Sequence, residues 1–102
     1  MNSPKYNVSQ EQHGRGGWVY YSEQTQLRFP WEILGVGGIA IRVPAPEDWD
    51  GFCEAQNAKW AKGRRREILE RIGKTFAKKR YRRGDFQLET TWVVVKPGSS
   101  LF

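Results

Sequence analysis

The sequence has little cysteine, little histidine and no long hydrophobic run. Its 102 residues include one cysteine, Cys53, and one histidine, His13. A single cysteine excludes an intramolecular disulfide and a multi-cysteine metal site, and a single histidine excludes a histidine-rich one. No apolar stretch approaches the roughly 20 residues that a membrane-spanning helix needs, and the first residues lack a hydrophobic signal-peptide segment. We therefore expect a soluble, cytoplasmic protein.

Aromatic and basic residues are abundant instead. The chain has five Trp, four Tyr and five Phe, and large side chains allow a short chain to form one modest core. Its net charge is +6, and this charge is unevenly placed. Twelve basic and two acidic residues lie between Lys59 and Arg83, whereas the remainder has five basic and nine acidic residues. The sequence thus predicts a basic segment attached to an acidic body.

Three segments before residue 44 have the pattern of β-strands. Residues 18–22 are aromatic and β-branched, residues 26–33 alternate apolar and polar side chains, and residues 39–43 are apolar again. The simplest interpretation is a three-stranded antiparallel meander. Pro30 places the middle segment at a sheet edge or a bulge, because proline cannot donate a ladder hydrogen bond. Residues 35–38 are glycine-rich, and we expect a hairpin turn there rather than a phosphate-binding loop, since no Lys-Ser/Thr follows.

Two helices and one further strand are expected after residue 45. Residues 46–58 begin with Pro46 and a group of acidic residues, which favours a short helix. Residues 62–83 have a narrow apolar stripe at helical spacing. Gly63 separates this helix from the first one, and the alternative is a single bent helix. The stripe consists of Ile68, Leu69, Ile72 and Phe76. Residues 86–95 alternate as one long strand, with Phe86, Leu88, Trp92 and Val94 on the same face.

The predicted order of elements is β-β-β-α-α-β. This order is typical of an α+β fold, in which one or two helices pack on one face of an antiparallel sheet. Residues 18–96 form the single domain in this interpretation. Residues 1–17 are expected to be a flexible N-terminal tail because they are polar and lack periodicity, and residues 97–102 a C-terminal tail.

Four short motifs occur in a recognisable order. They are Trp18-x-Tyr20, then Leu27-Arg28-Phe29-Pro30-Trp31-Glu32 running into Gly35-Val36-Gly37-Gly38, then Pro44-Ala45-Pro46-x-x-Trp49, then Arg65-x-x-Ile68-Leu69-x-x-Ile72. Over residues 18–95 the chain resembles a group of small uncharacterised bacterial proteins of unknown function. The resemblance implies a single compact α+β unit. It transfers no functional residue, because that group carries no assigned activity.

The basic segment provides the first candidate site. One face of the predicted helix carries five cations, and three more extend this face toward residue 83. They are Arg64, Arg66, Arg71, Lys74 and Lys78, and then Arg80, Arg82 and Arg83. These side chains could neutralise several phosphates of a nucleic acid, and Tyr81 among them could stack on a base. The alternative is a solvated helix face with ion pairs at i,i+4, namely Glu67 with Arg71 and Glu70 with Lys74.

Tryptophans provide the second candidate site. Five tryptophans are more than a small core is expected to bury, so an exposed Trp31, Trp49 or Trp60 could anchor a partner protein. The alternative is partial burial of these side chains at the rims of the sheet.

No set of residues in the sequence indicates catalysis. Glu47, Asp48, Asp50 and Glu54 could act as paired carboxylates or bind a cation, but their place at a helix start is explained by the helix dipole. Cys53 would need a base to act as a nucleophile, and the only histidine lies in the predicted N-terminal tail. Its place on a face with aromatic residues is that of a small buried side chain. We therefore expect a non-enzymatic binding module without a cofactor or metal. Its partner is expected to be an acidic protein surface or a nucleic acid, not a membrane.

Overall fold

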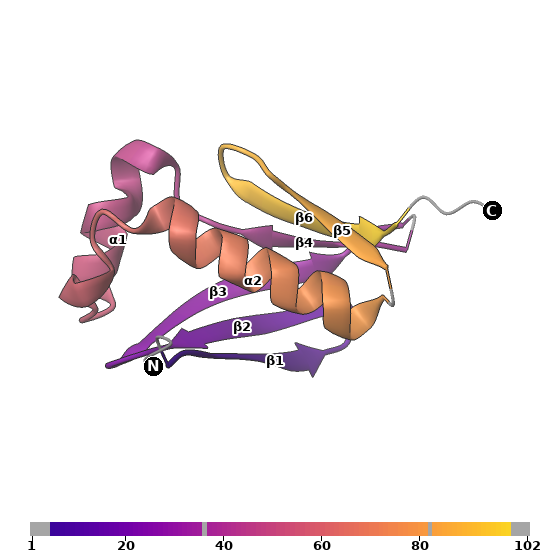
Figure 1. The fold of residues 1–102 in the computed structure, drawn as a ribbon, viewed down its shortest axis with the longest axis horizontal. Helices are drawn as coiled ribbons and strands as arrows, with labels where there is room; N and C mark the ends of the chain where they lie inside the picture. The colour runs from indigo at the N-terminus through magenta and orange to yellow at the C-terminus, as the bar shows by residue number, and fades with distance from the viewer. Residues whose placement is uncertain (1–4, 36, 82, 99–102) are drawn as a thin grey trace.

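The computed structural model describes residues 5–35, 37–81 and 83–98, which form an α+β fold (Figure 1). The elements are β1 (Asn7–His13), β2 (Gly16–Ser22), β3 (Gln26–Ile33), β4 (Ile39–Arg42), the 3-10 helix η1 (Pro46–Asp48), α1 (Trp49–Ala55), the 3-10 helix η2 (Lys59–Ala61), α2 (Arg65–Arg80), β5 (Gly84–Leu88) and β6 (Trp92–Pro97). The strands form one antiparallel sheet in the order β1-β2-β3-β4-β6-β5. Helix α2 crosses one face of this sheet, so the predicted fold class is confirmed (Figure 1).

The predicted meander is formed by β2, β3 and β4. The placement of Pro30 at a sheet edge was wrong, because β3 lies between β2 and β4. The ladder to β4 covers only the last three residues of β3, so the missing N–H of Pro30 falls outside it. Two residues earlier, on the same side of β3, the N–H of Arg28 bonds to the Gln56 side chain at 3.2 Å. A central strand therefore accommodates Pro30 because only part of its length is paired on both sides.

The prediction of a flexible tail over residues 1–17 was wrong, because residues 7–13 form strand β1 and β2 begins at Gly16. This strand pairs with β2 along its whole length, from Asn7 opposite Ser22 to His13 opposite Gly16. The side chain of Val8 is buried in the core. A strand with one apolar anchor among polar residues gives almost no hydrophobic alternation, which is why the sequence pattern did not reveal it. Residues 1–4 of the predicted tail lie outside the described residues.

The single strand predicted over residues 86–95 is also corrected, because the chain turns after Leu88 and returns as β6. The hairpin pairs Gly84 with Pro97 at one end and Leu88 with Val93 at the other. Because of this turn, the even-numbered residues of β5 share a face with the odd-numbered residues of β6, and not with the even-numbered ones. Phe86 consequently faces α2, whereas Trp92 lies on the opposite face of the sheet. Pro97, predicted as the first residue of a C-terminal tail, is instead the last residue of β6. Residues 99–102 of the predicted tail lie outside the described part.

The apolar stripe of α2 packs against the sheet as predicted. Ile68, Leu69, Ile72 and Phe76 are all buried, and burial of each such side chain contributes about 1.5–3 kcal/mol. The helix begins at Arg65 rather than at residue 62, because Gly63 has a φ of 76° and interrupts the helical path. It ends at Arg80. The short helix predicted over residues 46–58 is realised as η1 followed by α1.

Helix α1 and the segment after it close one end of the core. The rings of Trp49 and Phe52 stack with Phe29 of β3, at centroid distances of 6.1 and 5.3 Å. The indole N–H of Trp49 donates to the carbonyl oxygen of Ala61 at 2.9 Å, which ties α1 to η2. In Figure 1 this end lies opposite the C-terminal end of α2. The two ends of α2 therefore have different surroundings.

Candidate functional site

The first arginine of the basic segment, Arg64, is bound within the protein. Its guanidinium donates to both oxygens of Glu23, at 2.8 and 3.1 Å, and to both oxygens of Glu67, at 2.9 and 3.1 Å. Hydrogen bonds to Glu67 and then to Glu23 raise the pKa of Arg64. A guanidinium with two carboxylates has no charge left for a phosphate, so Arg64 is a structural residue.

Arg71 is held by the same acidic residues. Its guanidinium lies 2.9 Å from the hydroxyl oxygen of Tyr21, 3.2 Å from a Glu23 oxygen and 2.9 Å from a Glu67 oxygen. The predicted i,i+4 pair between Glu67 and Arg71 is thereby confirmed. Two arginines and two glutamates form one neutral cluster, which we call the Glu23 cluster, with Tyr21 at its inner side. It joins the β2–β3 hairpin to α2.

The protonation states of the Glu23 cluster follow from its contacts. Burial raises the pKa of Tyr21 to about 12, and the hydrogen bond to Glu23 acts in the same direction. Burial also disfavours the charged form of Glu23, but hydrogen bonds from Arg64 and Tyr21 outweigh this effect and lower its pKa. Glu23 is therefore ionised at neutral pH, and the cluster is internally compensated.

The next two arginines have different environments. Arg66 is 82 % exposed and lies 3.4 Å from Glu70, a solvent-screened pair of the kind that contributes little. The predicted pair between Glu70 and Lys74 is not among the ion pairs of the described residues. Arg65 donates to the carbonyl oxygens of Pro44, at 2.9 Å, and Thr90, at 2.8 Å. Burial lowers the pKa of Arg65. The bond to Thr90 shows that this side chain stabilises the β5–β6 turn and is not free for a ligand.

A second group of cations lies at the other end of α2 and remains open. These residues, which we call the C-terminal basic cluster, are Lys74, Lys78, Lys79, Arg80 and Arg83. All five are exposed. Among the described residues, none of the five has a carboxylate within 4 Å. The guanidinium of Arg80 also lies 5.8 Å from the ring centroid of Trp31, and Arg82 lies outside the described residues. The candidate anion site is therefore confined to this end of the predicted basic run.

A shallow cavity lies within the C-terminal basic cluster. Its volume is about 340 Å³, and its lining consists of Lys74, Ala77, Lys78, Arg83, Gly84, Asp85 and Phe86. Three of these residues are cations and one is an acid, so the lining is positive on balance. Tyr81 does not extend this site, because its hydroxyl donates to the carbonyl oxygen of Gly37 and its ring packs against the core.

The tryptophan prediction is wrong for two of its three residues. Trp49 is 1 % exposed and Trp31 is 4 % exposed, so neither can contact a partner protein. The aromatic core accommodates both rings, and the indole N–H of Trp31 donates to the Glu11 carbonyl oxygen at 3.1 Å. Trp60 is only partly buried. Its indole N–H donates to the Thr25 hydroxyl at 2.8 Å, and it remains a candidate anchor.

The acidic residues near α1 have structural contacts. Asp50 accepts a hydrogen bond from the backbone N–H of Gly63 at 2.9 Å, and Glu54 pairs with Lys62. Cys53 is fully buried, and burial raises the pKa of its thiol to about 11. Within the described ranges, no three or more His, Cys, Asp or Glu side chains lie close enough together to hold a metal ion.

The face of the sheet opposite α2, which we call the open face, carries residues that the sequence analysis did not single out. Trp18 and Tyr20 of β2 point to this face, because Val19 and Tyr21, which alternate with them along the strand, are buried on the other face. Trp92 of β6 does so as well. The guanidinium of Arg28 lies 4.2 Å from the ring centroid of Trp18, and that of Arg42 lies 4.9 Å from Trp92. The sequence did contain a signal for Trp18, because residues two apart in a strand, such as Trp18 and Tyr20, share one face. It contained none for Trp92, because the turn after Leu88 was not recognised.

Comparison with known proteins gives no family for this chain. No family model, no curated protein and no solved structure matches the sequence or the fold. The resemblance to uncharacterised bacterial proteins thus remains an expectation. Among the described residues, no helix is both long and apolar enough to cross a membrane. The candidate sites therefore stand on their own geometry.

Proposed function

We propose that this protein is a non-enzymatic binding module that binds nucleic acid through phosphate contacts of the C-terminal basic cluster. The observation that carries the proposal is the division of the basic run into two halves. Arg64 and Arg71 are neutralised by Glu23 and Glu67, whereas the cations of the C-terminal basic cluster are exposed and have no described carboxylate within 4 Å. A positive surface with uncompensated charge is what phosphates require.

The position of the cluster on α2 has a structural explanation as well. Lys78, Lys79 and Arg80 stand in the last turn of the helix, where cations offset the negative end of the helix dipole. That effect accounts for the sign of the charge in this turn. It does not account for Lys74 in the preceding turn or for Arg83 beyond the helix. These two residues line the cavity together with Lys78, which supports an anion as the ligand.

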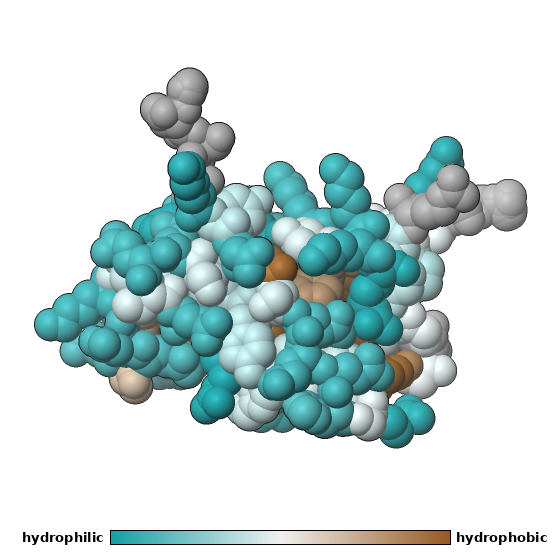
Figure 2. Space-filling view, turned by 90° about the horizontal axis from the view of Figure 1, so that it is seen from below, coloured by the Kyte–Doolittle hydropathy of each residue, from teal (hydrophilic) through white to brown (hydrophobic). Residues whose placement is uncertain are grey.

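An acidic protein surface is the second candidate partner. Trp60 favours it, because this partly buried ring lies beside the solvent and could act as an anchor. The surface character favours nucleic acid. Seen from the β1 edge, the molecule is largely hydrophilic, and hydrophobic residues show only as small patches (Figure 2). A partner that binds by charge therefore suits this face better than one that binds by apolar contact.

The test is a salt titration of binding to fluorescently labelled DNA and RNA, followed by anisotropy between about 50 and 200 mM salt. Lys78→Glu is the informative variant, and Lys59→Glu is its matched control. Both changes alter the net charge equally, but Lys59 lies in η2, at the other end of α2 (Figure 1). We expect Lys78→Glu to weaken binding on all sequences alike and to reduce the slope of log K against log salt by about 1.

Equal weakening by Lys78→Glu and Lys59→Glu would show that only net charge matters and would contradict the proposed site. Absence of binding even at the lowest salt would contradict nucleic acid as the partner. Reversal of Arg64 or Arg71 is not a suitable test. Either change would break the Glu23 cluster, so lost binding could not be separated from lost folding.

A further inference from the structure

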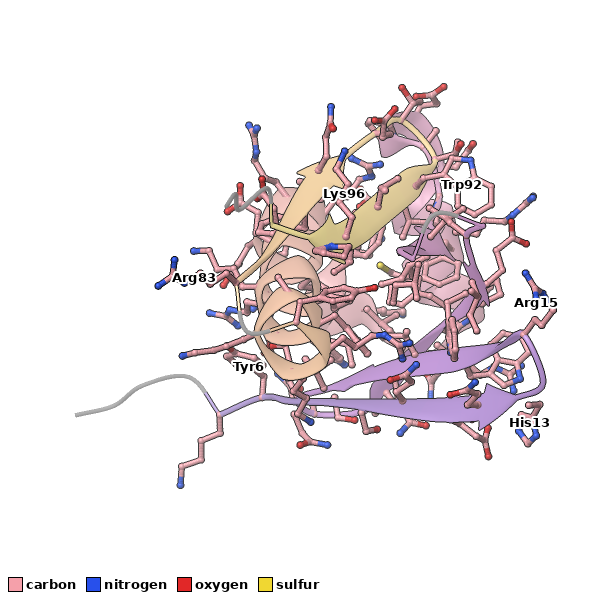
Figure 3. The ribbon with its side chains drawn as sticks, turned by 90° about the vertical axis from the view of Figure 1, so that its right-hand side faces the viewer. Tyr6, His13, Arg15, Arg83, Trp92 and Lys96 are labelled. Carbon is pink, nitrogen blue, oxygen red and sulfur yellow. The ribbon has the colours of Figure 1, made fainter. Side chains whose placement is uncertain are left out.

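The open face of the sheet has the composition of a ligand surface. In Figure 3, Trp92 lies on the side of the sheet away from α2, whereas Arg83 lies on the α2 side. Alternate residues of the strands point to the open face, and the helices leave them uncovered. They include Trp18, Tyr20, Arg28, Pro30, Arg42, Trp92, Val94 and Lys96, together with the acidic residues Glu11, Glu32 and Asp85. Three partly buried aromatic side chains thus share one surface with three basic and three acidic side chains.

Two of the aromatic rings lie in one row across the strands. Trp18 of β2 is opposite Pro30 of β3, and Arg42 of β4 is opposite Trp92 of β6. Trp31 opposite Ile41 is the last pair of the β3–β4 ladder at this end, and Pro30 and Arg42 are the residues next to that pair. The row places Trp18 and Trp92 three strand spacings apart, about 14 Å. Two stacking surfaces at this separation could hold two bases of one extended strand.

Each tryptophan of the row has an arginine against its ring. The Arg28 guanidinium lies 4.2 Å from the Trp18 centroid, and the Arg42 guanidinium lies 4.9 Å from the Trp92 centroid. A guanidinium plane stacks on bases as an aromatic ring does, and its charge attracts the phosphate backbone. Neither arginine has a described carboxylate within 4 Å. Both remain able to bind a ligand.

One end of the row adjoins a polar cavity of about 570 Å³. It is lined by Tyr20, Gln26, Arg28, Ala55, Gln56 and Asn57. Three of these residues carry side-chain amides, which can both donate to and accept from the edges of bases. One carboxylate on the open face, that of Glu11, accepts a hydrogen bond from the Tyr20 hydroxyl at 2.8 Å. Glu32 of β3 also points to this face and disfavours phosphates in its immediate vicinity.

We infer that the open face binds single-stranded nucleic acid, with Trp18 and Trp92 as base-stacking surfaces and Arg28 and Arg42 as contacts to bases and phosphates. The inference rests on the proposed function, which gives nucleic acid as the class of ligand. It adds that the nucleic acid is single-stranded. A duplex buries its base faces in its own stack and offers none to a tryptophan. A single strand exposes them, and stacking tolerates every base. Lys96, near the end of β6, is opposite Asp85 of β5.

The test compares a single-stranded oligonucleotide of about 12 nucleotides with a duplex of the same sequence. Trp18→Leu and Trp92→Leu are the test variants, and Trp60→Leu is the control, because it removes a partly buried indole away from the open face. Circular dichroism melting checks that each variant folds. Arg28→Ala and Arg42→Ala give a second, independent test, since both side chains are exposed and their loss spares the core.

We expect wild-type protein to prefer the single strand. Trp18→Leu and Trp92→Leu should each weaken single-strand binding about tenfold and leave duplex binding unchanged, whereas Trp60→Leu should alter neither. Equal affinity for the two forms, or unchanged single-strand binding in the tryptophan and arginine variants, would overturn the inference.

If Lys78→Glu still weakens binding in that case, the proposed function stands without the inference. If only the open-face variants weaken binding, the proposed site in α2 fails instead.

Discussion

Glu23 illustrates how the sequence order conceals a contact. It lies in the turn between β2 and β3, whereas its partners Arg64 and Arg71 are more than 40 residues away on α2. The prediction that both arginines face a phosphate treated the helix as an isolated element. The face assignment was correct, but no pattern along the chain indicates that a turn from another part of the sequence will lie against it. Arg66 and Lys78, which have no such neighbour, were predicted correctly as exposed.

Replacement of Glu23 by Gln tests the structural role of this cluster. We expect Glu23→Gln to lower the free energy of unfolding at neutral pH by about 1–3 kcal/mol, because it leaves two part-buried guanidinium groups without their shared carboxylate. The control is Glu70→Gln, which removes the exposed partner of Arg66 and should cost at most about 0.5 kcal/mol. Urea unfolding followed by tryptophan fluorescence measures both. Equal effects of the two changes would contradict the assignment.

The same variant has a defined pH dependence. Because the folded-state pKa of Glu23 is lowered from 4.5, its carboxylate contributes stability above that value. This contribution is lost as the pH falls through the lowered pKa, when the folded protein must also take up the proton. We therefore expect the stability difference between wild type and Glu23→Gln to be constant above about pH 5 and to shrink on further acidification. A difference that does not change with acid would argue against an ionised Glu23 in the folded protein.

At the scale of elements, the β5–β6 hairpin packs tightly on α2 through a glycine. Gly73 is buried in the middle of the helix, and a Cβ atom placed there would lie 2.4 Å from Cδ2 of Phe86. We expect Gly73→Ala to destabilise the protein by about 1–3 kcal/mol, although alanine favours a helix by about 1 kcal/mol. Thermal unfolding would measure the change. A stabilised variant would show that the hairpin does not lie as close to α2 as described.

Gly51 in α1 serves as the matched control for this substitution. It is also a helical glycine, but a Cβ atom there would have no neighbour within 4 Å. Gly51→Ala should therefore stabilise the protein by about 0.4–1 kcal/mol. In addition, Phe86→Leu combined with Gly73→Ala should cost less than the sum of the two separate changes, because the smaller side chain removes the overlap.

The elements that the sequence predicted are those with strong hydrophobic periodicity. The apolar stripe of α2 and the alternation in β3 each have several large side chains on one face, so the pattern determined both type and orientation. Strand β1 has a single buried valine and was missed. The turn after Leu88 was missed for a different reason, since Glu89-Thr90-Thr91 has no glycine or proline and continues the apparent period of two. Placement of Trp92 on the open face depended on that turn.

At the scale of the whole molecule, charge and aromatic residues are distributed over two sides of one sheet. The C-terminal basic cluster lies on the α2 side, and the row that contains Trp18 and Trp92 lies on the open face. In Figure 3 the labelled residues Arg83, Lys96 and Trp92 follow one another from the first side to the second. No single helix or strand contains this arrangement. It results from the strand order, which places the last hairpin beside β4.

The most direct test of nucleic-acid binding at these surfaces is a nuclear magnetic resonance titration of ¹⁵N-labelled protein with an unlabelled single-stranded oligonucleotide. The five indole N–H groups act as internal reporters. We expect shifts in the backbone amides of residues 74–80 and 83–85 and in the indole signals of Trp18 and Trp92. The indole of Trp49, which is buried and bonded to Ala61, should not move. Shifts confined to α1 and Trp60, or no shifts at physiological salt, would contradict it.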